Sequence, residues 1–188
     1  MYKYTKHLNY PINISKKDLK MAKYITSQIG GAQSELAATL RYFFQKFGMI
    51  DDKGRALLND IATEELGHLE MVSTMVKELT KNATIEELES VDLLGYFTEH
   101  NKGIFPTDAE GVPFNAAYFS VTKDPIADLF EDMSAEQKAR SVYENLIDIA
   151  LALNNKEVIG PLLFLRQREI VHFNRFKELY EYYKEKGY

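Results

Sequence analysis

Two short stretches of this chain place a glutamate three residues before a histidine, Glu65 before His68 and Glu169 before His172. The chain has only 4 histidines, so half of them lie in this pattern. Residues three apart on an α-helix lie on the same face, where a carboxylate and an imidazole can bind one metal ion. A single pair of this kind is more often an exposed side-chain interaction. Two such pairs in one chain indicate a metal site.

A metal site of this kind in a helical bundle also takes a glutamate from each of two further helices. Glu35 is the first candidate because it is the only acidic residue in the apolar stretch SQIGGAQSELAATLRYFFQKFG. A carboxylate in such surroundings must be neutral, paired or bound to a cation. The second candidate follows from an internal repeat. ELAATLRY from Glu35 aligns with EQKARSVY from Glu136, with alanine fourth and tyrosine eighth in both. Glu136 therefore takes the place of Glu35, and Glu144 is the alternative.

The stretches that carry these residues have the periodicity of amphipathic helices, and almost no alternating strand pattern is present. Ser15 and Ser134 are the expected N-caps of the first and third helices. Gly30 and Gly31 are expected to interrupt the first helix, or to let another backbone come close. The sequence predicts helices at about 15–48, 51–82, 134–154 and 156–186.

The connections between these helices predict the topology. Short links join the first helix to the second and the third to the fourth, whereas a crossover at about 83–130 separates the two pairs. One long crossover between two helix hairpins is the ferritin-like arrangement of a four-helix bundle. We therefore expect an all-α fold with a single domain over residues 1–188. Its first residues, at about 1–15, are expected to form an N-terminal arm.

The composition excludes several classes of protein. A formal net charge of −5, without a basic run, argues against a nucleic-acid partner. The absence of cysteine excludes disulfides, thiolate metal sites and thiol catalysis. No apolar segment reaches the roughly 18 residues that a membrane span requires, and the N-terminus lacks the apolar stretch of a signal peptide. We expect neither membrane insertion nor secretion.

The candidate ligands fall into two halves, one in each helix hairpin, which implies a pseudo-twofold centre with two metal ions. Carboxylates can bridge two ions, and carboxylates with imidazoles suit manganese and iron. A bundle with buried salt bridges and no metal is the competing interpretation. It is disfavoured because unpaired buried carboxylates are costly. In chain order the candidates are Glu35, Glu65, His68, Glu136, Glu169 and His172.

The chain resembles the manganese catalase family, and in particular its short spore-coat branch, the CotJC proteins. The resemblance runs nearly end to end, through the segments LNYPINI, DLKMAKYITSQIGGAQSELAATLRYFFQ, DIATEELGHLEM, GVPFNAAY, DPIADLFEDMSAEQKAR and FLRQREIVHFNRF. It implies a ferritin-like di-manganese domain in which Glu65 bridges the two ions, Glu169 is a proton-handling base and Tyr42 orients a ligand. The ligands that the resemblance implies are Glu35, Glu65, His68, Glu136 and His172.

The resemblance also implies an activity. The expected reaction is disproportionation of hydrogen peroxide to water and oxygen, with two manganese ions per chain cycling between Mn(II) and Mn(III) pairs. The expected partners are further copies of the chain, in an assembly such as a hexamer, and other spore coat proteins. The expected location is the spore coat or the cytoplasm of the mother cell. The alternatives are a ferritin-like di-iron oxidase, with iron in place of manganese, and a mainly structural coat protein whose metal site is vestigial.

The remaining two histidines are expected to lie outside the site. His7 falls in the N-terminal arm and His100 in the crossover. Both are expected to be surface or loop residues rather than metal ligands.

Overall fold

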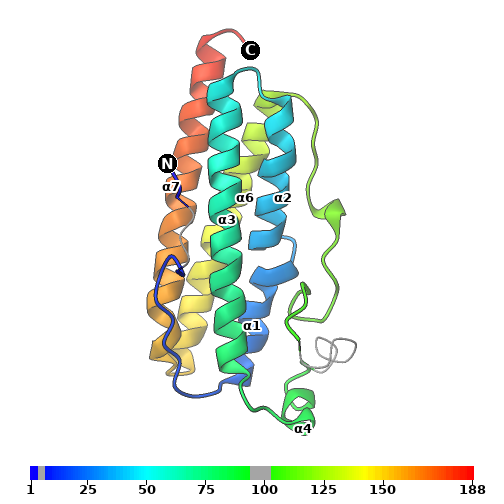
Figure 1. The fold of residues 1–188 in the computed structure, drawn as a ribbon, viewed down its shortest axis with the longest axis vertical. Coiled ribbons are helices and arrows are strands. Elements are labelled where there is room, and N and C mark those ends of the chain that lie inside the picture. Colours follow the sequence, from blue (N-terminus) through cyan, green and yellow to red (C-terminus); the bar gives the residue numbers. More distant parts are fainter. Residues whose placement is uncertain (4–6, 94–102) are drawn as a thin grey trace.

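The long helices stand side by side in an upright bundle in the computed structural model, which describes residues 1–3, 7–93 and 103–188 (Figure 1). α1 and α2 follow each other along one side, and α3 runs back beside them. α6 and α7 form the second hairpin. The bounds are Leu19–Gly30 for α1, Glu35–Gln45 for α2, Asp52–Leu79 for α3, Pro125–Ala152 for α6 and Ile159–Glu185 for α7.

The crossover connects the two hairpins along the outside of the bundle. It begins with the short helix α4 (Ile85–Glu89) at the bottom of Figure 1, and its described part climbs the right-hand side to the start of α6 near the top. In the described residues the only β-structure is an isolated bridge between Thr107 and Pro113. The predicted all-α bundle with one long crossover is confirmed. His100 lies outside the described residues, and His7 is exposed.

Two predicted helix starts were wrong. α1 begins after Asp18, whose carboxylate accepts a hydrogen bond from the Met21 N–H at 3.0 Å. The Ser15 hydroxyl instead donates a hydrogen bond to Glu157 at 2.6 Å. This bond joins the N-terminal arm to the start of the segment at about 156–186 that was predicted as the fourth helix. α6 begins at Pro125 rather than after Ser134, so the crossover ends at Asp124 and not near residue 130.

The start of α6 has a clear physical cause. The Asp124 carboxylate accepts hydrogen bonds from the backbone N–H groups of Ile126 and Ala127, at 2.9 and 3.1 Å. Pro125 takes the first helical position, where its missing N–H costs nothing. This pair is a stronger start signal than Ser134, which lies inside the helix.

The predicted interruption at the two glycines is present, and it separates α1 from α2. A Cβ atom on Gly30 would lie 2.4 Å from the Pro106 carbonyl carbon, so the crossover backbone lies directly against the break. Further along, the Arg41 guanidinium donates to the Tyr118 carbonyl at 3.3 Å, and the Gln45 amide donates to the Ser120 carbonyl at 3.1 Å. The described crossover is therefore held against α2.

Two apolar clusters form the core. One contains Met21, Ile25 and Met75, with residues of α1, the second half of α3 and the adjoining parts of α6 and α7. The other contains Leu58 and Phe176, with residues of α2, the first half of α3 and the opposite ends of α6 and α7. The candidate ligands occupy the sequence positions between these clusters, so a polar layer separates two apolar ones.

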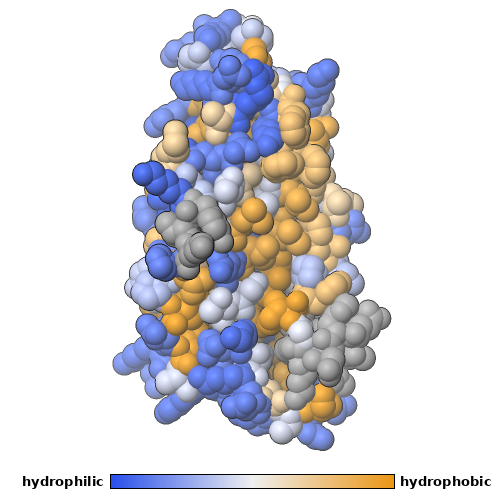
Figure 2. Space-filling model, in the orientation of Figure 1, coloured by the Kyte–Doolittle hydropathy of each residue, from blue (hydrophilic) through white to orange (hydrophobic). Residues whose placement is uncertain are grey.

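Apolar residues also reach the surface. Figure 2 shows them along the centre and right of the face seen in Figure 1. Phe43, Phe44 and Phe47, at the end of α2 and just after it, are 40%, 47% and 67% exposed. Across the described residues, no helix combines the length and the apolar character that a membrane crossing would require.

Candidate metal centre

The side chains of the candidate ligands meet in the middle of the bundle. Glu35 is the first residue of α2, where the helix dipole favours a carboxylate and Ser34 caps the helix through the Ala37 N–H. α3 and α7 each supply a glutamate and a histidine one turn apart. All the candidates are at most 3% exposed: Glu35, Glu65, His68, Glu136, Glu169 and His172.

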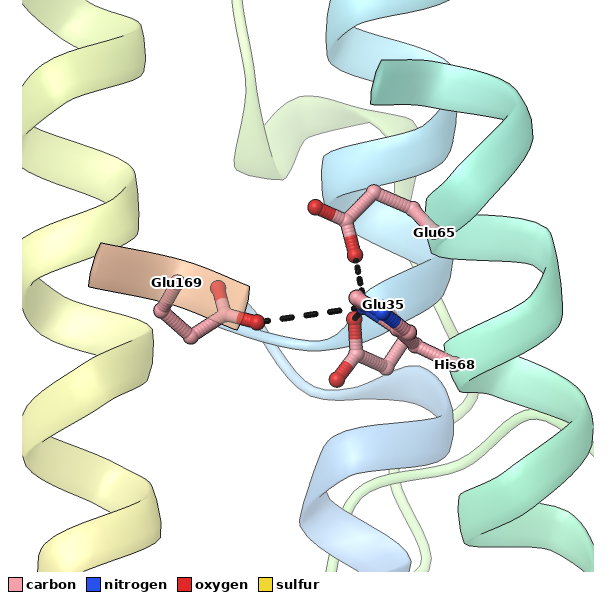
Figure 3. Close-up of side chains that lie close together, drawn as sticks. All are labelled: Glu35, Glu65, His68 and Glu169. Carbon is pink, nitrogen blue, oxygen red and sulfur yellow. Dashed lines mark hydrogen bonds and ion pairs between the residues drawn. The ribbon is translucent and has the colours of Figure 1, made fainter. Parts of the chain in front are cut away.

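These residues form two overlapping groups of possible ligands, with the ligand atoms of each group within 4.8 Å of one another. Glu65 and Glu169 belong to both groups. Glu35 and His68 complete the first group, and Figure 3 shows its carboxylates and imidazole converging from α2, α3 and α7. Glu136 and His172 complete the second group. Two groups that share two carboxylates are the arrangement required to hold a pair of neighbouring ions.

Glu65 lies between the two imidazoles. Its Oε2 atom is 2.7 Å from Nδ1 of His68, and its Oε1 atom is 2.7 Å from Nδ1 of His172. The two rings stack at a centroid distance of 5.6 Å. Each oxygen of one carboxylate therefore faces a different histidine, so Glu65 is placed to bridge two ions.

The other carboxylates lie slightly farther from the imidazoles. Nδ1 of His68 is 3.7 Å from Glu35 and 3.9 Å from Glu169. Nδ1 of His172 is 3.8 Å from Glu136. The same nitrogen of each ring thus faces the shared space.

Glu64 lies beside the outer nitrogens, Nε2, of His68 and His172. It was not predicted from the sequence as a site residue. It lies 3.7 Å from Nε2 of His68 and 3.2 Å from Nε2 of His172, and it accepts a hydrogen bond from Arg168 at 2.5 Å. A carboxylate beside the outer nitrogen favours the tautomer that leaves the inner nitrogen free to bind metal. The spacing of Glu64 and His68, four residues apart on one helix, was the available signal.

Two tyrosines support the glutamates across the bundle. The Tyr143 hydroxyl on α6 donates a hydrogen bond to Glu35 on α2. Tyr42 on α2 is buried and lies beside Glu136 on α6. Tyr42 and Tyr143 hold the same place in the internal repeat, and each lies beside the glutamate of the other helix. Tyr143 was aligned with Tyr42 in the sequence but was not predicted as a site residue.

The protein alone does not balance the charge of this centre. Burial, together with the negative charge of Glu65, raises the pKa of Glu35 to about 8. Burial likewise raises the pKa of Glu136 to about 7 and holds the pKa of Glu169 well above its usual range. The pKa of Glu65 is lowered despite burial because the imidazoles of His172 and His68 stabilise its charge. Three carboxyl groups thus lack sufficient positive charge nearby.

The donor set fits a metal cation. Both oxygens of Glu136 and one oxygen of Glu169 are buried without a well-aligned hydrogen-bond donor among the described residues. Buried carboxylates without partners are costly, and a bound cation removes that cost. Carboxylate oxygens with imidazole nitrogens are ligands that manganese accepts.

Comparisons with known proteins agree with this chemistry. A family model described as manganese containing catalase matches residues 1–187. The chain belongs to the manganese catalase family. It is 48% identical to protein CotJC of Bacillus subtilis (strain 168), over 98% of this chain and 96% of that protein. It is 32% identical to a probable manganese catalase of Clostridium acetobutylicum, over 100% of this chain and 83% of that protein.

A solved manganese catalase has the same fold. The crystal structure of KatB, a manganese catalase from Anabaena, superposes with a TM-score of 0.86 at 30% identity, over 98% of this chain and 81% of that chain. The resemblance to the manganese catalases and to their CotJC branch is therefore confirmed, and the family implies manganese as the metal of this centre.

Proposed function

We propose that this manganese catalase family member disproportionates hydrogen peroxide to water and oxygen at a centre of two manganese ions. The observation that carries the proposal is the pair of overlapping ligand groups that share Glu65 and Glu169. Glu65 would hold both ions, because its two oxygens already face different histidines. Glu35 and His68 would complete the ligands of one ion, and Glu136 and His172 those of the other.

The bound manganese pair supplies a reversible two-electron couple, which peroxide chemistry requires in both directions. The protein supplies fixed donors and proton handling. The Glu64 carboxylate lies 3.7 Å and 3.2 Å from the outer nitrogens of His68 and His172, and its charge favours a proton on those nitrogens, which would leave both Nδ1 atoms a lone pair for metal. The Tyr143 hydroxyl donates a hydrogen bond to Glu35 from across the bundle, and the buried Tyr42 lies beside Glu136. These contacts keep the ligands in place while the charge of the centre changes.

Glu169 is the proton-handling base of this proposal. Glu65 and Glu169 are equivalent in the two Glu-x-x-His pairs, but their environments differ. Two imidazoles lower the pKa of Glu65, whereas burial raises the pKa of Glu169, whose nearest imidazole nitrogen is 3.9 Å away. Carboxyl groups whose pKa values are driven apart take different roles. The oxidation of one peroxide to oxygen releases two protons, and Glu169 would accept one of them. The reduction of a second peroxide to two water molecules consumes two protons, and Glu169 would return the one it holds.

The assembly and the location belong to the same proposal. The exposed aromatic residues Phe43, Phe44 and Phe47 form an apolar surface suited to contact with further copies of the chain, consistent with a homo-oligomer such as a hexamer. The 48% identity to protein CotJC supports a place in the spore coat, among other coat proteins, or in the mother cell that builds the coat.

The test is metal content by elemental analysis together with oxygen release from peroxide, on protein produced with manganese and separately with iron. About two manganese ions per chain with oxygen release are expected. Glu65→Gln and His172→Ala are expected to lose both metal and activity. Glu169→Gln is expected to keep the metal and lose oxygen release, which separates a base from a ligand.

Glu144→Gln is the matched control, because Glu144 pairs with Arg140 and Arg166 away from the centre. It should retain both metal and turnover. Bound iron without peroxide turnover would replace the proposal with a ferritin-like di-iron oxidase. No bound metal under either condition would indicate a structural coat protein with a vestigial site.

A further inference from the structure

A narrow cavity reaches the centre through the seam between α2 and α6. Its volume is about 10 Å³, which is room for about one water molecule. Glu35 and Glu169 line its inner part, and Ala38, Ala135 and Ala139 line its walls. The outer part reaches Gln33 and Ala139, which are only half-buried. The cavity therefore lies between Glu169 and half-buried residues near the surface.

The larger hollows of the molecule lie elsewhere. The groove beside α3 and α7, lined by residues such as Lys53 and Glu178, has a volume of about 680 Å³ and contains none of the proposed ligands. A second hollow reaches Glu64 and Arg168, which stand behind the imidazoles rather than in the space that the ligands face. The small cavity, in contrast, is lined by both a proposed ligand, Glu35, and the proposed base, Glu169.

We propose that peroxide enters through this seam, and that the methyl groups of Ala38, Ala135 and Ala139 set its width. The seam then admits hydrogen peroxide, which is close to water in size, and excludes organic hydroperoxides. This inference rests on the proposed function, and it adds the residues that determine which peroxide the site accepts.

Alanine side chains line the passage on both sides, from α2 and from α6. Ala38 and Ala139 hold the same place in the internal repeat, each three residues after the glutamate that its helix contributes. One alanine methyl group of α2 and two of α6 therefore line the passage, beside the side chains of Arg41 and Tyr42. A side chain with more atoms would fill a space that holds one water molecule, because packed protein interiors have little spare volume.

Polar contacts hold α2 and α6 together close to these alanines. The Arg41 guanidinium is 4% exposed and lies 3.3 Å from Glu131 on α6. Gln45 donates to the same carboxylate at 3.0 Å, and Arg41 also donates to the crossover at Tyr118. These contacts join α2, α6 and the crossover, so the separation of the two helices is fixed near the passage.

The experiment compares Ala139→Leu with Ala127→Leu, both on manganese-loaded full-length protein. Ala127 is exposed on the same helix and lies outside the seam, so it is the matched control. Two readouts are used: kcat/KM for oxygen release, and the relaxation of water protons caused by bound Mn(II). The second depends on exchange of water with the centre and needs no turnover.

Ala139→Leu is expected to keep its manganese, to lower kcat/KM by about tenfold and to lower the relaxation effect. Ala127→Leu is expected to change neither. Ala139→Gly provides a second test in the opposite direction, since it should accelerate the consumption of ethyl hydroperoxide relative to the wild-type protein. It also covers the case in which the leucine variant does not fold.

Unchanged turnover and unchanged relaxation in a folded, manganese-loaded Ala139→Leu protein would overturn the passage while leaving the catalase proposal standing. Manganese binding without oxygen release in the wild-type protein would overturn the proposed function, and the relaxation readout would still decide whether the seam is the route to the centre. A wild-type protein that binds no manganese would overturn both.

Discussion

Glu65 and Glu169 are chemically identical side chains at equivalent positions of two similar helices, and their surroundings separate them. Glu65 has an imidazole nitrogen 2.7 Å from each oxygen, so its negative charge is stabilised. Glu169 lies among other carboxylates, and burial with the charges of Glu65 and Glu136 raises its pKa. The same residue type can thus serve in both of the proposed roles, bridging ligand for Glu65 and base for Glu169.

Glu64→Gln is expected to weaken manganese binding. Glu64→Gln removes the negative charge beside the outer nitrogens of His68 and His172, which weakens the preference for the metal-binding tautomer. The manganese affinity is expected to fall by about 10- to 100-fold. Manganese titration measures it, with Glu70→Gln, exposed on the same helix, as the control. Equal affinities for both variants would contradict a role of Glu64 in orienting the rings.

Asp132→Asn is expected to stabilise the folded protein. Asp132 is fully buried, and neither carboxylate oxygen has a hydrogen-bond partner in the part of the chain that the structure describes. Burial raises its pKa well above the usual range, although Arg41 opposes the shift. A raised pKa in the folded state contributes stability below the pKa of the unfolded chain and loses it as the pH rises. Asp132→Asn is therefore expected to raise the free energy of unfolding by about 1–2 kcal/mol near neutral pH.

Chemical denaturation across a pH series measures this effect. The gain should shrink toward about pH 4, where the aspartate of the unfolded chain also takes up a proton. Asp148→Asn, exposed on the same helix, is the control and should change stability little. A destabilised Asp132→Asn protein at neutral pH would show that the buried carboxylate has a partner that the present contacts do not include.

At the scale of the elements, the break between α1 and α2 determines the position of Glu35. The interruption lets α2 start anew at Ser34, so that Glu35 lies in its first turn and faces the centre. The crossover backbone at Pro106 fills the space beside Gly30. The break is therefore shaped by a residue more than seventy positions away in the chain.

Gly30→Ala tests this close approach. Alanine usually stabilises a helix relative to glycine by up to about 1 kcal/mol. Here its Cβ would lie 2.4 Å from the Pro106 carbonyl carbon, so backbone must move, and the variant is expected to lose about 1–3 kcal/mol. Gly160→Ala on α7 is the control, because its nearest neighbour is the flexible Tyr10 side chain. Thermal unfolding of both variants measures the difference, and a stabilised Gly30→Ala protein would contradict the approach.

At the scale of the whole molecule, the polar centre divides the core into two apolar clusters. The centre contributes little apolar burial itself, and without metal it contains carboxyl groups whose charged forms are disfavoured. The pKa of Glu35 is about 8 and that of Glu136 about 7, each raised first by burial. The metal-free bundle is thus expected to be weakest in its middle layer as the pH rises through these values.

Manganese is expected to reverse this weakness. Binding requires deprotonated carboxylates and neutral imidazoles, so it releases protons and strengthens as the pH rises. Ligand that binds only the folded protein raises its melting temperature. Added Mn(II) should therefore raise Tm more at about pH 8 than at about pH 6. Scanning calorimetry measures the shift, and His172→Ala is expected to abolish it. A larger shift at the lower pH would contradict the assignment of these carboxylates as ligands.

The sequence by itself was sufficient for the features that follow from short-range periodicity. Helical spacing predicted the bundle, and the two Glu-x-x-His pairs predicted which faces of α3 and α7 turn inward. The internal repeat also separated two carboxylates correctly in space: Glu136 is buried in the centre, whereas Glu144 pairs with Arg140 and Arg166. The metal-ligand and base roles of these residues stay predictions.

Only the tertiary structure decided the contacts between residues far apart in the chain. The hydrogen bond from Tyr143 to Glu35 joins positions 108 apart, and the contact of Glu64 with His172 joins two different hairpins. The narrow seam at Ala38 and Ala139 likewise requires two helices to be in place. Helical periodicity states which face of a helix is buried, but not which side chains it meets. The environments that distinguish ligand, base and passage therefore arise only when the hairpins pack together.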